Sequence, residues 1–186
     1  MRLIALLRNP VDRAFSSYLH LLRDGREPLD TFEEALQAEE ERIRAGWEYL
    51  WHYTRVGYYH TQLKRYWDRF PADQIAVFMF DEFRSRPDAV LRKVLSFLQV
   101  DSEVEIDTSM QYNISGTPRV RTLHGFISRP NPIKRLTHAF TSRSFRIRLG
   151  NRLARWNLTG SERPQMAEGT RRSLQELFSE DVIQLQ

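Results

Sequence analysis

The sequence predicts an α/β protein built on a parallel sheet that is flanked by helices. Residues 2–7 and 74–80 are short, continuous apolar runs, the pattern of strands buried on both faces. Between and after these runs the apolar residues recur at helical spacing. Strands that alternate with helices are typical of α/β proteins, so the sheet is expected to be parallel.

A helix is predicted over residues 10–23, directly after the first strand. Asn9 is a suitable N-cap, Pro10 fits the first helical position, and Asp12 follows three residues after the cap. The pair Asp24-Gly25 ends the helix. The chain therefore passes from strand to helix through a tight turn.

A second helix is expected from Thr31 to about residue 49. Thr31 and Glu34 have the spacing of a capping box. The acidic residues on its polar face are expected to be solvent-exposed. Further helices are predicted over 59–69, 86–98 and 166–185, with a loop over 101–118 and short helical pieces over 120–155.

Length and composition favour one globular domain spanning residues 1–186. The chain has 41% hydrophobic and 28% charged residues, and it has no cysteine, so disulfides and thiolate chemistry are excluded. No apolar run reaches the roughly 18 residues that a membrane span requires. We find no signal peptide pattern, and we expect a cytoplasmic protein.

Basic residues concentrate in the second half of the chain. The net charge is +4, and 25 of the 28 basic residues are arginine. Residues 113–172 hold thirteen basic residues and two acidic ones. This distribution is compatible with an ordinary solvated surface, and it also fits an anion-binding surface for nucleotide phosphates or a polyanion.

The turn after the first strand has the chemistry of a phosphate site. Arg8 ends the strand, and Ser16 falls in the second turn of the following helix. Helix N-termini attract anions, and a guanidinium binds phosphate through two parallel hydrogen bonds. The alternative is that Arg8 only terminates a strand, as in many α/β proteins.

Two blocks of this sequence resemble the sulfotransferases that use 3′-phosphoadenosine 5′-phosphosulfate (PAPS). The first block, Arg-Asn-Pro-Val-Asp-Arg-Ala-Phe-Ser-Ser-Tyr at 8–18, resembles their 3′-phosphate-binding segment. The second runs from Gly57-Tyr58-Tyr59 through 74–83 to Phe97-Leu98 and is similar to carbohydrate-type and bacterial members. Both blocks occur in the family's order, and the resemblance covers roughly residues 1–120.

The resemblance implies an enzyme that transfers a sulfuryl group from PAPS to a hydroxyl or amine of a carbohydrate or small molecule, without a metal. Arg8 and Ser16 fall on the family positions that contact the nucleotide 3′-phosphate. A basic loop over 112–121 falls where many members close a loop over the nucleotide, which makes Gly116, Arg119 and Arg121 further candidate nucleotide-binding residues. An ordinary surface loop is the alternative reading of that segment.

The family's catalytic parts have no counterpart in this sequence. Members place a phosphate loop with Lys, Gly and Thr, and usually the general base, upstream of the Arg-Asn-Pro strand. None of the three lysines, Lys64, Lys93 and Lys134, precedes a Gly-Thr pair. We therefore expect a P-loop-NTPase-like, three-layer sulfotransferase fold that is N-terminally truncated, lacks its first strand and phosphate loop, and is inactive alone. No catalytic residue is assigned.

The sequence is compared with two other functional classes, a polyanion-binding module and a kinase, by the motifs that each requires. The basic second half suggests a nucleic-acid- or polyanion-binding module without catalysis, but no helix-turn-helix, zinc or ribonucleoprotein signature accompanies it. A P-loop kinase is disfavoured because no Gly-x-x-x-x-Gly-Lys-Ser/Thr occurs. An aromatic cluster is compatible with an acceptor pocket lined by His52 or His60, although such clusters are more often core. Its members are Trp47, Trp51, Tyr53, Tyr58 and Tyr59.

Overall fold

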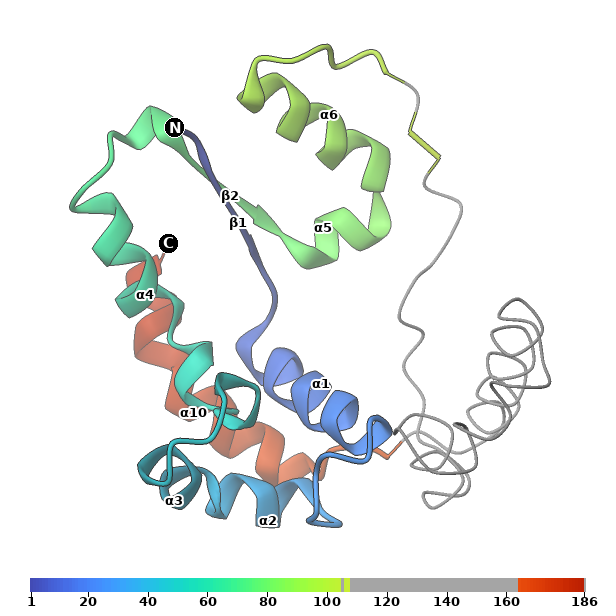
Figure 1. Ribbon diagram of the computed structural model, residues 1–186, viewed down its shortest axis with the longest axis vertical. Coiled ribbons are helices and arrows are strands. Elements are labelled where there is room, and N and C mark those ends of the chain that lie inside the picture. The colour runs from blue at the N-terminus through green and yellow to red at the C-terminus, as the bar shows by residue number, and fades with distance from the viewer. Residues whose placement is uncertain (105, 108–163, 186) are drawn as a thin grey trace, which may run out of the picture. The chain divides into compact units, whose positions relative to one another are not determined.

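The computed structural model describes residues 1–104, 106–107 and 164–185 (Figure 1). The predicted loop over 112–121 and the helical pieces over 120–155 lie outside these residues. The described residues form parts of two compact units. The first holds residues 1–14, 52–104, 106–107 and 168–185, and the second holds 15–51 and 164–167. None of the described helices is long and apolar enough to cross a membrane.

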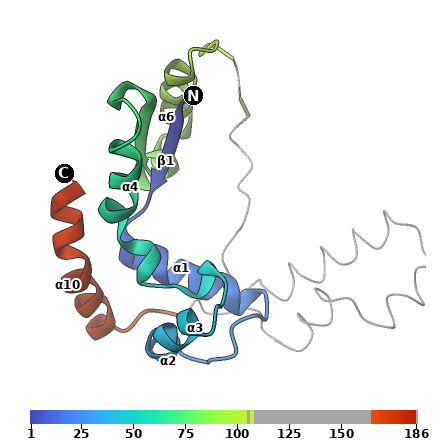
Figure 2. The same cartoon turned by 60° about the vertical axis from the view of Figure 1, so that its left-hand side comes forward.

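A parallel pair of strands lies at the centre of the first unit, as the sequence predicts. Strand β1 (Leu3–Leu7) pairs with β2 (Ile75–Met79), and the register runs from Leu3 opposite Ile75 to Leu7 opposite Met79. The chain leaves β1 directly into helix α1 (Pro10–Arg23), as Figures 1 and 2 show. The other helices of this unit are α4 (Tyr59–Trp67), α5 (Phe80–Ser85), α6 (Pro87–Leu98) and α10 (Glu168–Leu185).

The prediction that both strands are buried on two faces is wrong for the described part of the chain. Leu7 is buried, but Ile4 and Leu6 on β1, and Val77 and Met79 on β2, are exposed. Among the described residues the sheet has only two strands, so each strand has one partner and its faces are incompletely covered. The end of β1 next to the turn is its best-covered part.

Helix α10 packs beside α4 and supports the segment that leads into it. The Asp181 carboxylate accepts hydrogen bonds from the backbone N–H groups of His60 and Thr61, at 3.0 and 3.3 Å, in the first turn of α4. Acidic groups at a helix N-terminus satisfy free N–H groups and interact favourably with the helix dipole. The C-terminal helix thus fixes the start of α4, more than a hundred residues away in sequence.

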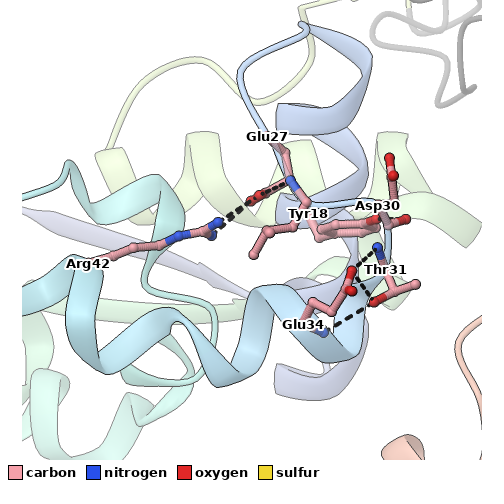
Figure 3. A network of polar contacts seen from close by, with 7 residues as sticks. Tyr18, Glu27, Asp30, Thr31, Glu34 and Arg42 are labelled. Carbon is pink, nitrogen blue, oxygen red and sulfur yellow. Dashed lines mark hydrogen bonds and ion pairs between the residues drawn. The ribbon is translucent and has the colours of Figure 1, made fainter.

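The second unit is organised around the later turns of α1 and two short helices, α2 (Phe32–Gln37) and α3 (Glu39–Arg44). Tyr18 and Phe32 are buried, with ring centroids 5.4 Å apart. The Tyr18 hydroxyl donates to the Asp30 carbonyl at 2.7 Å, next to the predicted capping box of Thr31 and Glu34 (Figure 3). The capping prediction is confirmed.

One expected helix over 31–49 is instead two helices, and its polar face is not wholly exposed. The break lies at Ala38, where no glycine or proline interrupts the sequence. Glu39 and Arg42 of α3 are buried. Arg42 donates two hydrogen bonds to the Glu27 carboxylate, at 2.9 and 2.7 Å (Figure 3). Because a buried charge needs a partner, we attribute the redirected helix to this ion pair.

Candidate anion-binding site

The turn between β1 and α1 has the cap that the sequence predicts. The Asn9 side-chain oxygen accepts hydrogen bonds from the backbone N–H groups of Val11 and Asp12, at 3.0 and 3.3 Å. The Arg13 N–H donates to the Asn9 carbonyl at 2.9 Å, and Pro10 has no N–H to satisfy. The first turn of α1 therefore has acceptors for its backbone donors.

Because of this cap, the backbone N–H groups at the turn are not the main donors for an anion. The sequence predicts that unpaired N–H groups at the N-terminus of this helix bind the anion. Asn9 already occupies those donors in this structure. An anion at this turn must therefore be held chiefly by side chains, and the dipole of α1 adds a smaller favourable field.

Arg8 is the cation best placed at the turn. Its side chain is half-buried, and its guanidinium carbon lies 5.2 Å from the centre of the Phe80 ring. A ring beneath a guanidinium holds its plane without using its hydrogen-bond donors. Within the described residues no carboxylate pairs with Arg8, so its charge is not neutralised by an acid there.

Ser16 and its neighbour Ser17 have different surroundings in α1. The Ser17 hydroxyl donates to the Leu50 carbonyl at 2.8 Å, which ties α1 to the segment after α3. Ser16 is half-buried, and in the described part of the chain its hydroxyl has no such bond. Ser17 thus has a structural role that Ser16 lacks.

Tyr59 is a component of the turn that sequence reasoning missed. Its phenol lies close to the Arg8 backbone and to the Arg13 guanidinium, and both contacts favour its ionised form. Burial raises the pKa of Tyr59 above its ordinary value of 10.0, and the charges of Arg13 and Arg8 partly oppose this. The Arg13 guanidinium also donates to the Tyr53 carbonyl. Tyr59 thus joins the end of β1 to the start of α4.

An ion pair from the C-terminal helix modifies the charge beside the turn. The Arg171 guanidinium lies 3.0 Å from the Asp12 carboxylate, and both side chains are about one-third exposed. Asp12 is the acid in the first turn of α1. Its pairing with Arg171 reduces the repulsion that this carboxylate would exert on an anion at the turn.

The structure does not test the other three predicted nucleotide-binding residues. Gly116, Arg119 and Arg121 lie outside the described residues. In the part of the chain that is described, no group of three or more His, Asp or Glu side chains is arranged to hold a metal ion. Glu82 forms a 2.7 Å pair with Lys93, which lowers the pKa of the Glu82 carboxyl.

These features define the class of the protein: an α/β protein with a parallel sheet, in which an arginine stands between the end of a strand and the capped start of a helix. The sequence model of the sulfotransferase domain matches residues 1–124. The chain belongs to the sulfotransferase family.

Curated relatives and a solved structure agree with this assignment. The chain is 32% identical over 119 residues to bifunctional heparan sulfate N-deacetylase/N-sulfotransferase 1 of Xenopus laevis. It is 26% identical over 115 residues to the human N-deacetylase/N-sulfotransferase 2. A crystal structure of a sulfotransferase from Alicyclobacillus acidocaldarius shares 49% identity, with a TM-score of 0.57. Each comparison covers 60% of this chain.

The match spans only part of each relative. It covers 13% of the length of the two curated enzymes and 45% of the solved bacterial chain. The parallel sheet is seen in this chain, and membership of the sulfotransferase family follows from the sequence model. The sulfuryl donor, the acceptor and the roles of individual residues need separate arguments.

Proposed function

We propose that this sequence provides the 3′-phosphate-binding part of a PAPS-dependent sulfotransferase. PAPS supplies the sulfuryl group, and the acceptor is a hydroxyl or amine of a carbohydrate or small molecule. The observation that supports this most is Arg8, a half-buried cation stacked on Phe80 at the end of β1 with no acidic partner among the described residues. Arg8 binds the 3′-phosphate through its guanidinium, and Ser16 contributes its hydroxyl.

The residues at the turn are chemically suited to a phosphate. The Asn9 cap leaves side chains as the main donors, and a guanidinium is well matched to a phosphate group. Phe80 restricts the orientation of Arg8, which lowers the entropy lost on binding. Arg171 counters the nearby Asp12 carboxylate. In the same proposal Gly116, Arg119 and Arg121 line the nucleotide.

Arg8→Ala should weaken binding of 3′-phosphoadenosine 5′-phosphate by about 1.5–3 kcal/mol, or roughly ten- to a hundred-and-fifty-fold, since a charge-assisted contact is lost. Titration calorimetry with this nucleotide and with adenosine 5′-phosphate measures the effect. The second nucleotide lacks the 3′-phosphate, so its affinity should change little. Ser16→Ala should cost less than Arg8→Ala.

Arg2→Ala is the matched control for that experiment. Arg2 precedes the same strand, and its guanidinium carbon lies 5.3 Å from the Phe97 ring centre, a similar cation–π contact. The control should bind both nucleotides like the parent chain. Equal losses in Arg2→Ala and Arg8→Ala, together with DNA binding at physiological salt, would instead favour a general polyanion-binding module.

We also propose that residues 1–186 alone do not catalyse transfer. The two lysines within the described residues already form exposed ion pairs, Lys64 with Asp68 at 2.9 Å and Lys93 with Glu82 at 2.7 Å. Neither precedes the Gly-Thr pair that the family's phosphate loop uses. A transfer assay with radiolabelled PAPS should give no product above background. Turnover by the purified chain would show that catalytic groups are present in it.

A further inference from the structure

Helix α10 brings a charged residue to the turn between β1 and α1, although it lies outside residues 1–124, the segment that carries the family match. The Arg171 guanidinium lies 3.0 Å from the carboxylate of Asp12, a residue 159 positions earlier in the chain. Asp12 is the acid in the first turn of α1 and follows Arg8 by one helical turn. This ion pair therefore sets part of the charge beside the proposed phosphate site.

Buried side chains hold the face of α10 that carries Arg171. Leu174, Phe178 and Asp181 follow Arg171 at helical spacing, and they are 4%, 1% and 6% exposed. The Phe178 ring packs edge-to-face on Tyr58, and the Asp181 carboxylate accepts hydrogen bonds from backbone N–H groups in the first turn of α4. Because Arg171 shares this face, the packing of the whole helix brings its guanidinium to Asp12.

The next residue, Arg172, shows how an ordinary surface arginine behaves on this helix. Its guanidinium lies 3.4 Å from the Glu168 carboxylate in the same helix, and the two side chains are 72% and 68% exposed. Exposed pairs within a helix contribute little. Arg171 pairs outside its own helix, and the side chains of Arg171 and Asp12 are only 35% and 39% exposed. Water screens the charges of this second pair less, so they act more strongly on a nearby anion.

The Asp12 carboxylate has opposing effects at the turn. In the first turn of α1 it interacts favourably with the helix dipole. The same charge repels a phosphate that binds beside the turn, and the repulsion is largest for a phosphate monoester, which carries nearly two negative charges at neutral pH. In the part of the chain that the structure describes, Arg171 is the cation paired with Asp12. It offsets the repulsion while Asp12 keeps its place in the helix.

We propose that Arg171 is a specificity-determining residue of the nucleotide site. By neutralising Asp12, it raises the affinity for a nucleotide that carries a 3′-phosphate relative to one that lacks it. This inference rests on the proposed function, in which Arg8 binds that phosphate. Arg171 acts through Asp12 and does not itself contact the nucleotide. Helix α10 thus takes part in selecting the nucleotide from outside the segment that carries the family match.

The test compares Arg171→Gln with the parent chain by titration calorimetry, using 3′-phosphoadenosine 5′-phosphate and adenosine 5′-phosphate. Arg171→Gln should bind the first nucleotide about three- to tenfold more weakly, because Asp12 then repels its 3′-phosphate without compensation. The affinity for the second nucleotide should change by less than about twofold, because that nucleotide has no phosphate at the turn. The loss should shrink as salt is added. Arg171→Lys keeps the charge and should bind both nucleotides like the parent chain.

Two further variants separate this charge effect from a loss of structure. Adding Asp12→Asn to Arg171→Gln removes the uncompensated carboxylate, so the affinity for the 3′-phosphorylated nucleotide should return to within about twofold of the parent value. A purely structural role of the ion pair would give no such rescue. Arg172→Gln is the matched control, because it removes a guanidinium from the exposed face of the same helix. It should leave both affinities unchanged.

The outcomes distinguish this inference from the proposed function on which it rests. Unchanged affinity in Arg171→Gln, or a loss that Asp12→Asn does not rescue, would overturn the inference alone if Arg8→Ala still weakens binding. An equal loss in Arg172→Gln would also overturn it, since net charge would then explain the effect. No binding by the parent chain, or unchanged affinity in Arg8→Ala, would refute the proposed function and this inference together.

Discussion

Glu27→Ala is expected to lower the free energy of unfolding by about 3–5 kcal/mol, the cost of leaving a buried charge without its partner. The Glu27 and Arg42 side chains are 0% and 6% exposed, and two short hydrogen bonds join them. Glu27 also accepts a hydrogen bond from the Leu29 N–H at 3.0 Å. The substitution therefore removes two hydrogen bonds from a buried guanidinium and, at the same time, the acceptor of a backbone donor.

Chemical denaturation followed by tryptophan fluorescence measures this loss, because Trp47 and Trp51 lie in the same unit as the ion pair. The control is Glu40→Ala, which breaks an almost fully exposed pair with Arg44 at 3.6 Å. Exposed pairs contribute about 0–1 kcal/mol, so its effect should be small. In the double variant Glu27→Ala/Arg42→Met much of the stability should return, because neither charge of this pair is then left without the other. Equal effects of Glu27→Ala and Glu40→Ala would contradict the argument.

Short sequence patterns predicted the elements whose bounds depend on residues close to them in the sequence. Helix α1 begins at Pro10 and ends at Arg23, as its cap and its Asp-Gly ending predict. Helix α6 likewise spans Pro87–Leu98, within one residue of its predicted range. The sheet is parallel, as the alternation of strands and helices predicts, and the structure shows that β1 and β2 are neighbours in it.

Long-range contacts decided the features that the sequence did not predict. The break at Ala38 accompanies the ion pair of Arg42 with Glu27, fifteen residues earlier. Helix α5 begins at Phe80, where the sequence predicts the last residue of the strand, because no glycine or proline marks the boundary between the two elements. The contact of Tyr59 with Arg8 joins segments about fifty residues apart, and no local pattern indicates it.

Only part of the candidate site could be predicted from the sequence, because some of its contacts are local and others form only in the folded chain. The cap at Asn9 is a local feature, and it is confirmed. The sequence does not show that Asn9 occupies the backbone N–H groups that are expected to bind an anion. Only the geometry of the turn shows this. The supporting contacts of Tyr59 and Arg171 depend on α4 and α10, which approach the turn only in the folded chain. The phosphate-binding roles of Arg8 and Ser16 stay a prediction.

Phe178→Ala is expected to cost about 3–5 kcal/mol of unfolding free energy, the range for removing a buried aromatic side chain. Phe178 on α10 is 1% exposed, and its ring lies 5.3 Å from that of Tyr58, in an edge-to-face arrangement. The neighbouring Leu177 is 46% exposed. Leu177→Ala is the matched control, and it should cost far less. A similar loss in both variants would show that α10 is not anchored by the buried ring.

A second substitution, Gly57→Ala, tests whether the Phe178 ring is the reason that position 57 must be glycine. A Cβ at Gly57 would lie 2.6 Å from two Phe178 ring atoms and 3.3 Å from the Pro10 Cβ. Because Phe178 is buried and cannot move aside, Gly57→Ala alone should cost about 1–3 kcal/mol through overpacking. In the Phe178→Ala background the cavity receives the new methyl group, so Gly57→Ala should then be nearly neutral. The double-mutant cycle isolates this coupling. Additive losses would mean that Pro10, at the start of α1, sets the constraint instead.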